Sequence, residues 1–159
     1  MTTPLQPFGT GSRCKAFQLP KTIRTPSAAR RLVRHALAEW LIPHDVLDTA
    51  QLLVSELVTN AVTHAEGPVG LLLLHTWRGG HPVLRVEVTD ASTRPAQREE
   101  PAEQDEHGRG LDLVETLADR WGQDAFAHGK RIWCELMRPQ GLAQGRRSLH
   151  RGAGGRLAP

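Results

Sequence analysis

Three polar residues spaced by four, Glu56, Asn60 and His64, lie within the stretch SELVTNAVTHA at residues 55–65. On a helix this spacing places their side chains along one ridge, with a rise of about 6 Å between neighbours. A carboxylate can orient or deprotonate a hydroxyl, and a carboxamide oxygen is a hard neutral ligand that suits Mg²⁺ and its phosphate partners. The alternative is a solvated helix face, on which His64 caps or packs.

Asp90 closes a segment, residues 82–90, in which apolar and polar side chains alternate as they do on a strand. A charge at the end of such a strand is expected to point into a cleft, where its carboxylate can accept the exocyclic amino group of adenine. The alternative is an ordinary turn aspartate that caps the backbone of Ser92 or Thr93.

Two glycines precede a helical pattern in the stretch HGRGL at residues 107–111. Glycines let backbone N–H groups approach a phosphate, and a helix N-terminus supplies positive potential. Arg109 adds a charged fork for phosphate oxygens. Gly108 and Gly110 therefore indicate a phosphate-binding turn, although Gly-Arg-Gly is also a common turn. No Walker A sequence occurs, because HGKRI at 128–132 lacks the preceding glycine and the hydroxyl.

The remaining patterns predict the elements that must position these residues. Thr25 suits a helix N-cap because Pro26 follows it, and Gly122 is expected to cap the end of the last helix. In chain order we expect a strand at 15–20, helices at 25–42 and 45–64, an antiparallel hairpin of strands 69–77 and 82–90, a long polar loop, a helix at 110–122, and a second hairpin of strands 124–128 and 131–137 around Gly129.

Hairpins with helices between them predict the α+β fold class. We expect a two-layer α/β sandwich in which the helices cover one face of a mixed, mainly antiparallel sheet. The length of 159 residues suits one domain. We place that domain at 15–139, between a disordered N-terminus at 1–14 and a disordered basic Gly/Arg tail at 140–159.

The formal net charge of +3 conceals an uneven distribution. The first 38 residues hold seven basic residues and no acid, and the last 20 hold four arginines and no acid. Residues 39–139 hold 17 acidic against nine basic residues, a formal charge of −8. Nucleic-acid binders usually carry a basic folded face. Direct nucleic-acid binding is therefore not expected, apart from a weaker alternative in which the arginine-rich tail tethers the protein to a nucleic acid.

Composition also bears on the compartment. Cys14 and Cys134 are the only cysteines and lack metal-ligand spacing, which argues against a disulfide framework or a zinc site. No apolar run approaches the ~18–20 residues that a membrane span needs, and the start lacks a hydrophobic signal-peptide core. We expect no membrane association and a cytoplasmic location.

The order of the three motifs resembles the histidine kinase-like ATPase fold that gyrase B, Hsp90, MutL and sensor kinases share. More closely, the chain resembles the small anti-sigma-factor serine kinases and their actinobacterial relatives. SELVTNAVTHA is similar to the N box of that family, VEVTDAS to its G1 box, and GRGLDLVETLADRWG to its G2 box. The likeness extends from about Ala16 to Met137.

The resemblance implies a role for each matching residue. Asn60 would coordinate the Mg²⁺ that bridges the phosphates of ATP, and Glu56 would position or deprotonate the attacking serine hydroxyl of a protein substrate. Asp90 would bind the adenine amino group. The remaining residues that the resemblance assigns to the nucleotide site are His64, Gly108, Arg109, Gly110 and Leu111.

The resemblance further implies a regulatory kinase that binds a sigma factor and phosphorylates a small anti-anti-sigma partner of the STAS type. The alternative is a module of the same fold that holds nucleotide or partner without transferring phosphate. Members of that family often dimerise, so a homodimer is compatible with the resemblance, and no residue pattern decides it.

Two departures from the family pattern predict weak ATP binding. Arg131 stands where the family often has a hydroxyl residue that supports the adenine-binding aspartate. The loop before Gly108 is unusually acidic, and acids beside a triphosphate repel it unless they point outward or meet Mg²⁺.

Overall fold

The computed structural model describes residues 11–64, 67–92 and 110–137. The predicted loop and the C-terminal tail lie outside these residues. The described elements follow the predicted order and number, with bounds shifted by a few residues. They are β1 (Arg13–Leu19), α1 (Thr25–Glu39), α2 (His44–His64), β2 (Val69–Arg78), β3 (His81–Asp90), α3 (Gly110–Leu117), β4 (Arg120–Phe126) and β5 (Gly129–Met137). The proposed domain limits stay a prediction, and β1 begins at Arg13, inside the segment expected to precede the domain.

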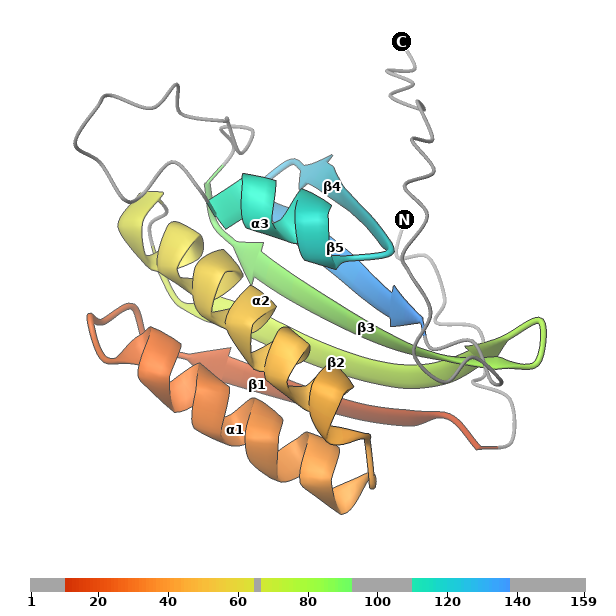
Figure 1. The fold of residues 1–159 in the computed structure, drawn as a ribbon. Helices are drawn as coiled ribbons and strands as arrows, with labels where there is room; N and C mark the ends of the chain where they lie inside the picture. Colours follow the sequence, from red (N-terminus) through yellow and green to blue (C-terminus); the bar gives the residue numbers. More distant parts are fainter. Residues whose placement is uncertain (1–10, 65–66, 93–109, 138–159) are drawn as a thin grey trace, which may run out of the picture.

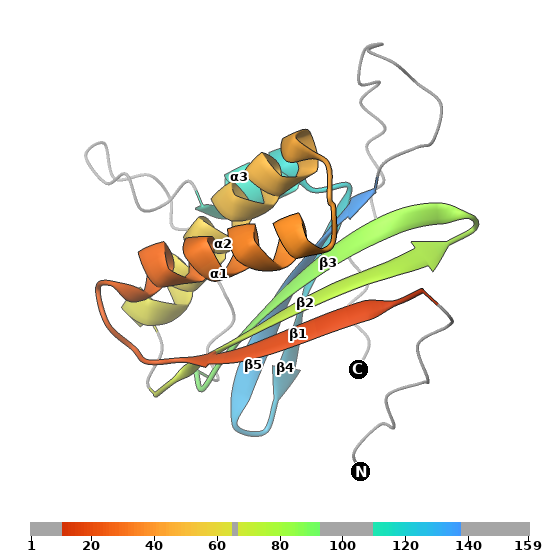
Figure 2. The same cartoon turned by 90° about the horizontal axis from the view of Figure 1, so that it is seen from below.

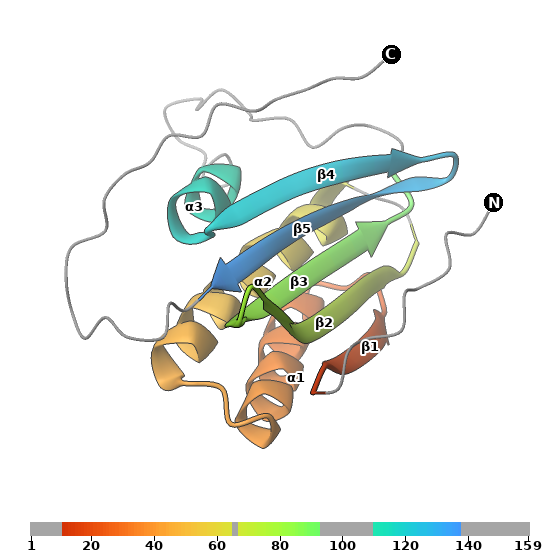
Figure 3. The same ribbon diagram turned by 90° about the vertical axis from the view of Figure 1, so that its right-hand side faces the viewer.

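The strands form one sheet in the order β1-β2-β3-β5-β4, and Figure 3 shows the strands side by side in front of the helices. Each of its four pairings in the described residues is antiparallel. All three helices lie on the same face of this sheet (Figure 2). The predicted α+β fold with helices on one face of a mainly antiparallel sheet is therefore confirmed.

The core lies between this face and the helices. Along β3, Leu84, Val86 and Val88 face the helices and are buried, as the alternation predicts. The predicted stripe of α2 includes Leu53 and Leu57, both fully buried against the sheet. Burying a leucine side chain contributes about 1.5–3 kcal/mol, so this stripe fixes which face of α2 turns away from the sheet.

The predicted end of the last helix is wrong. The helix α3 ends at Leu117, and Gly122 lies within β4, opposite Trp133 of β5. A Cβ atom at residue 122 would lie 2.7 Å from the ring of Trp133. The glycine is therefore needed for the close approach of a tryptophan across the sheet, and not for a helix cap.

The predicted N-cap is also displaced by one residue. Arg24 is the N-cap of α1, and Thr25 is the first helical residue, where it is buried. Its hydroxyl donates a hydrogen bond to the carbonyl of Pro20 and accepts one from the backbone N–H of Thr22 at 3.2 Å. Thr25 thus ties the loop after β1 to the start of the helix. None of the described helices is long and apolar enough to span a membrane.

The two cysteines are expected to differ sharply in reactivity. Cys134 lies in the core, and burial raises the pKa of its thiol to about 12, whereas Cys14 is exposed on β1. At pH 8 we expect a thiol reagent to modify one cysteine of the native protein and two of the urea-unfolded protein, because the thiolate is the reactive form. A Cys14→Ser variant should show no reactive thiol until it unfolds. Two reactive thiols in the native protein would contradict this packing of β5.

Candidate nucleotide site

The ridge predicted on α2 is present. Leu57, Val58 and Ala61 of α2 are buried, and Glu56 and Asn60 lie beside them at the edge of the core, each half-buried. His64 is the last residue of the helix and is exposed. No hydrogen bond or ion pair within the described part of the chain engages Glu56 or Asn60.

Asp90 points to the helix-covered face of the sheet, because it has the same parity along β3 as Val86 and Val88. Its side chain is only 3% exposed. One carboxylate oxygen, Oδ1, accepts a hydrogen bond of 2.8 Å from the backbone N–H of Ser92. The turn-capping alternative is therefore observed, and it leaves the second oxygen, Oδ2, for another contact.

That second oxygen faces Lys130, whose ammonium nitrogen lies 3.6 Å away. Lys130 is the direct partner of Asp90 in the pairing of β3 with β5. The neighbouring Gly129 allows this approach, because a Cβ atom there would lie 2.2 Å from the carbonyl oxygen of Asp90. Any larger residue at 129 would push the start of β5 away from the end of β3.

The three predicted motifs meet at one end of the molecule. The C-terminal end of α2, the end of β3 and the beginning of α3 all lie on the left in Figures 1 and 2. The helix α2 also packs on both β3 and α3. Gly110 begins α3, and Leu111 is buried. Gly108 and Arg109 lie outside the described residues, so their predicted contact with phosphates stays a prediction.

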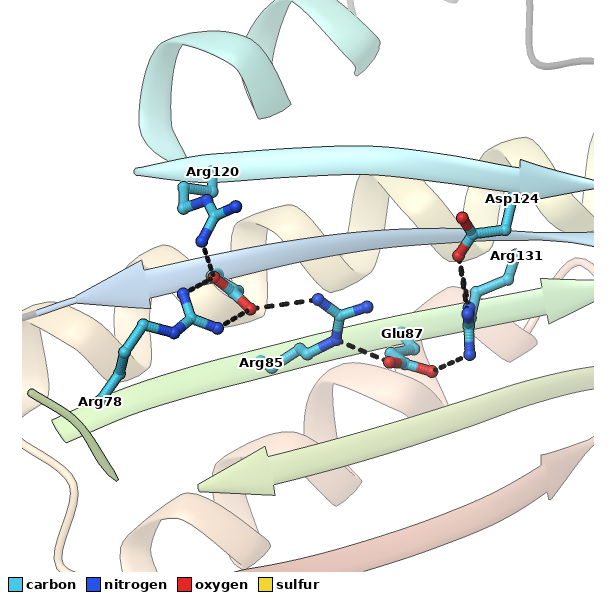
Figure 4. Close-up of polar contacts among 7 residues, drawn as sticks. Arg78, Arg85, Glu87, Arg120, Asp124 and Arg131 are labelled. Carbon is cyan, nitrogen blue, oxygen red and sulfur yellow. Dashed lines mark hydrogen bonds and ion pairs between the residues drawn. The ribbon is translucent and has the colours of Figure 1, made fainter. Parts of the chain in front are cut away.

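Arg131 does not approach Asp90 from the helix side. It has the opposite parity to Lys130 on β5, and its guanidinium binds Asp124 at 2.7 Å and Glu87 at 3.2 Å. Both partners lie on the face of the sheet that the helices leave uncovered (Figure 4). Arg131, which stands where a hydroxyl residue was expected, therefore does not place a competing positive charge beside Asp90. The acidic loop lies outside the described residues.

A chain of ion pairs on that uncovered face continues from Glu87. Arg85 binds Glu87 at 2.6 Å and Glu135 at 3.1 Å, and Arg78 forms a two-pronged pair with Glu135 at 2.7 and 2.9 Å (Figure 4). Burial alone raises the pKa of the Glu135 carboxyl, but the hydrogen bonds and charges of Arg78 and Arg85 outweigh it and lower the pKa. This network stabilises the sheet and lies on the face away from the candidate site.

A magnesium ion at this site would depend on few protein ligands. Among the described residues no three His, Cys, Asp or Glu side chains form a metal-binding group. Magnesium keeps several waters and is commonly held by one or two protein oxygens together with substrate phosphates. The half-buried carboxamide of Asn60, which has no polar partner among the described residues, fits that requirement, so the residues present are compatible with the ion.

Lys130 was not among the predicted site residues. Its sequence context, HGKRI, argues only against a Walker A loop, and it reveals no partner. The pairing of β3 with β5 brings Lys130 opposite Asp90, 40 positions earlier in the chain. The alternation of side chains along β5 would have placed Lys130 beside Asp90 only if the order of the strands in the sheet had already been known.

Comparison with known proteins agrees with the fold. A solved structure with a similar fold is that of the RsbU and RsbW domains of Rv1364c from Mycobacterium tuberculosis, with a TM-score of 0.56 and 22% sequence identity. The match covers 83% of this chain and 35% of that chain, so this chain spans about a third of the length of the solved protein. At this identity the likeness shows the fold alone. A search of curated proteins finds no match.

The sequence model of the Histidine kinase-like ATPase domain matches residues 19–134, from the end of β1 into β5. That range contains the α2 ridge, Asp90 and the start of α3. Because the match covers well over half of the chain, the chain belongs to the histidine kinase-like ATPase domain family, and this membership implies that it binds ATP.

Proposed function

We propose that this protein is an ATP- and Mg²⁺-dependent regulatory kinase that transfers the γ-phosphate of ATP to a serine or threonine of a protein partner. The observation that carries the proposal is the pair of half-buried polar side chains, Glu56 and Asn60, on the helix that packs against β3. Neither side chain has a polar partner among the residues that the structure describes. Asp90 ends that strand, buried and facing the helices. Phosphoryl transfer requires mainly positioning and charge neutralisation, which such an arrangement can supply.

Each side chain has a separate role in this proposal. Asn60 offers a neutral oxygen to the magnesium ion, which neutralises phosphate charge when bound. Glu56 lies one turn earlier and orients or deprotonates the attacking hydroxyl. Asp90 accepts the amino group of adenine through Oδ2, because Oδ1 is occupied by the Ser92 backbone. Gly110 opens α3 on the phosphate side, together with Gly108 and Arg109, while Leu111 and His64 line the nucleotide.

The proposed partners follow from the same family likeness. We propose a sigma factor as the sequestered partner and a small STAS-type anti-anti-sigma protein as the phosphate acceptor, with the protein acting in the cytoplasm as a homodimer. The shared fold with a solved protein that contains an RsbW domain supports this choice. An active kinase is proposed in preference to a module that only binds nucleotide, because both Glu56 and Asn60 are unengaged within the described residues.

Replacing Asn60 by alanine should weaken Mg-ATP binding by about 100-fold, the upper end of what the loss of a group that supports a bound metal costs. The affinity for ATP without magnesium should change little, because adenine recognition at Asp90 is untouched. Titration calorimetry with and without Mg²⁺ measures both quantities.

Gln51→Ala provides the matched control, since it removes a carboxamide from the same helix nine residues before Asn60. Gln51 donates a hydrogen bond to the carbonyl of Arg30 and lies far from Asp90 along α2. We expect wild-type nucleotide affinity for this control. Unchanged Mg-ATP affinity in Asn60→Ala would contradict the metal role, and the absence of ATP binding in the wild type would overturn the proposed function.

A further inference from the structure

Leu41, in the turn between α1 and α2, has two features that disfavour a leucine. Its φ angle is +58°, and it is the only non-glycine residue with a positive φ among those that the structure describes. It is also 86% exposed. The left-handed conformation usually belongs to glycine at the end of a helix, and an exposed leucine gains nothing from burial. The folded chain alone therefore gives no reason for a leucine at this position.

The backbone of this turn does not need the leucine side chain. The N–H of Leu41 donates to the carbonyl of Ala38 at 3.0 Å, and the N–H of Ile42 donates to the carbonyl of Leu37 at 2.9 Å. These two bonds form a Schellman motif, in which Leu41 occupies the left-handed position. Because both bonds use backbone atoms only, glycine at residue 41 would keep them.

A groove of about 700 Å³ lies between α1 and α2, next to this turn. The two helices pack side by side (Figure 1). Ala38 and His44, which flank the turn in the chain, line the groove together with the buried Leu47. Gln51 lines it further along α2 and donates a hydrogen bond of 3.1 Å to the carbonyl of Arg30 in α1. The groove therefore has apolar lining near the turn and walls that are linked to each other.

The wall that α1 contributes is basic. Arg31, Arg34 and His35 line the groove and are exposed, and no acidic residue precedes Glu39 in the sequence. Neither arginine has a hydrogen bond or an ion pair with another described residue. On the opposite wall Asp48 is the acidic lining residue. Two arginines outnumber this one carboxylate, so the groove is complementary to a ligand with negative charge.

We propose that this groove docks an acidic amphipathic helix of a protein partner, with Leu41 as the apolar anchor at one end. Acidic side chains of that helix pair with Arg31 and Arg34, and its apolar face contacts Leu41. An amphipathic helix that lies in a groove is a recurring mode of recognition, in which apolar anchors supply much of the affinity. The partner thus supplies the burial that Leu41 lacks in the free protein.

This docking surface is separate from the candidate nucleotide site. The groove uses residues 44–51 of α2, whereas Glu56 lies two turns beyond Asp48, about 12 Å along the helix axis. The proposal therefore goes beyond the proposed kinase function and does not rest on it. A nucleic acid is a poorer occupant, because residues 39–139 carry a formal charge of −8 that repels a polyanion.

The first test replaces Leu41 by glycine. The urea midpoint of unfolding should rise, because glycine adopts the left-handed conformation without a steric penalty. The affinity for an acidic helix should nevertheless fall about tenfold, since the contact of a leucine side chain is lost. The probe is a fluorescein-labelled synthetic peptide of about 18 residues, long enough to form a helix, with leucines on one face and glutamates beside them. Fluorescence anisotropy measures its binding to the full chain.

Ile23→Gly is the matched control for this change. Ile23 is 94% exposed and precedes α1, at the end of that helix away from the groove, so this variant should bind the peptide as the wild type does. A lower urea midpoint in Leu41→Gly would show that the fold itself requires the leucine, and it would overturn the anchor role. Unchanged peptide affinity in Leu41→Gly would overturn it as well.

The second test reverses the charge of the basic wall. A variant with both Arg31→Glu and Arg34→Glu should bind the acidic peptide at least about tenfold more weakly. Arg24→Glu makes the same change at the exposed N-cap of α1, outside the groove, and should leave the affinity within about twofold. A peptide with lysines in place of the glutamates should not bind the wild type.

Three results would overturn the proposed partner. They are equal binding of the two peptides, binding of neither peptide, and binding of a single-stranded oligonucleotide in their place with an affinity that Leu41→Gly does not change. The last result would assign the groove to nucleic acid. None of these measurements includes ATP, so the failure of this proposal is distinguishable from a failure of the proposed kinase function.

Discussion

A Glu56→Gln variant is expected to lose phosphate transfer by about 100- to 10,000-fold, the contribution that a positioned general base typically makes. Its affinity for Mg-ATP should stay within twofold of the wild type. Glutamine preserves the size and hydrogen-bonding oxygen of the half-buried side chain but cannot take a proton from a hydroxyl. Transfer of labelled phosphate to a serine-containing STAS-domain protein, measured in single turnovers, separates the chemical step from binding.

Asp48→Asn is the matched control for this experiment. Asp48 is an exposed carboxylate on the same helix, eight residues before Glu56, so the same chemical change is made two turns away. We expect wild-type transfer from this variant. Full transfer by Glu56→Gln would contradict the role of Glu56. Measurable Mg-ATP binding by the wild type with no transfer to any candidate partner would instead favour the module that binds nucleotide without catalysis.

Much of this fold could be predicted because it depends on local periodicity. The alternation of residues 82–90 gave the correct two faces of β3, with Leu84, Val86 and Val88 inward and Arg85 and Glu87 outward. Helical spacing found the buried stripe of α2 for the same reason. The N-box ridge, Asp90 and the start of α3 all lie on the predicted elements. These motifs could be placed because the periodicity of the residues around them indicates the secondary structure directly.

The features that were missed depend on contacts distant in sequence. Residues 118–122 favour a helix by local propensity, but Asp119 donates its backbone N–H to the carbonyl of Glu135, and β4 then pairs with β5. Tertiary pairing overrides propensity in such segments. The Asp90–Lys130 pair likewise requires the order β3-β5, in which a strand follows its neighbour only after a helix and another strand.

The ion pairs on the uncovered sheet face are also invisible to local patterns. From the sequence alone, Arg78, Arg85 and Glu135 are ordinary charged residues that would be expected to be exposed to solvent. The sheet brings the two arginines to one carboxylate that is 3% exposed. Arg85 also stacks over the ring of Trp133, 4.0 Å from its centroid. The carboxylate of Glu135 is therefore shielded from water although no helix covers it, and the arginines replace water as its hydrogen-bond donors.

A Glu135→Gln variant is accordingly expected to lower the free energy of unfolding at pH 7 by about 2–3 kcal/mol. Arg85 accounts for most of this loss, because its side chain is 20% exposed, whereas Arg78 is 48% exposed and its pair is weakened by solvent. In the variant the arginines would face a neutral amide. Its single oxygen cannot accept the two charge-assisted hydrogen bonds that the carboxylate accepts from Arg78. Urea unfolding at several pH values measures the difference.

The pH dependence identifies charge as the cause. The folded protein lowers the pKa of Glu135, so the stabilisation it provides is fully present above the unfolded-state pKa, about 4.3 for glutamate. It is lost as the pH falls through the lower, folded-state pKa. The difference in stability between the wild type and Glu135→Gln should therefore begin to narrow near the unfolded-state pKa and should close once the pH lies below the folded-state pKa. Glu39→Gln, which removes an exposed partner of Lys15, should leave stability nearly unchanged at every pH. A gap for Glu135→Gln that persists undiminished in acid would place its origin in packing and not in the pairing of Glu135 with Arg78 and Arg85.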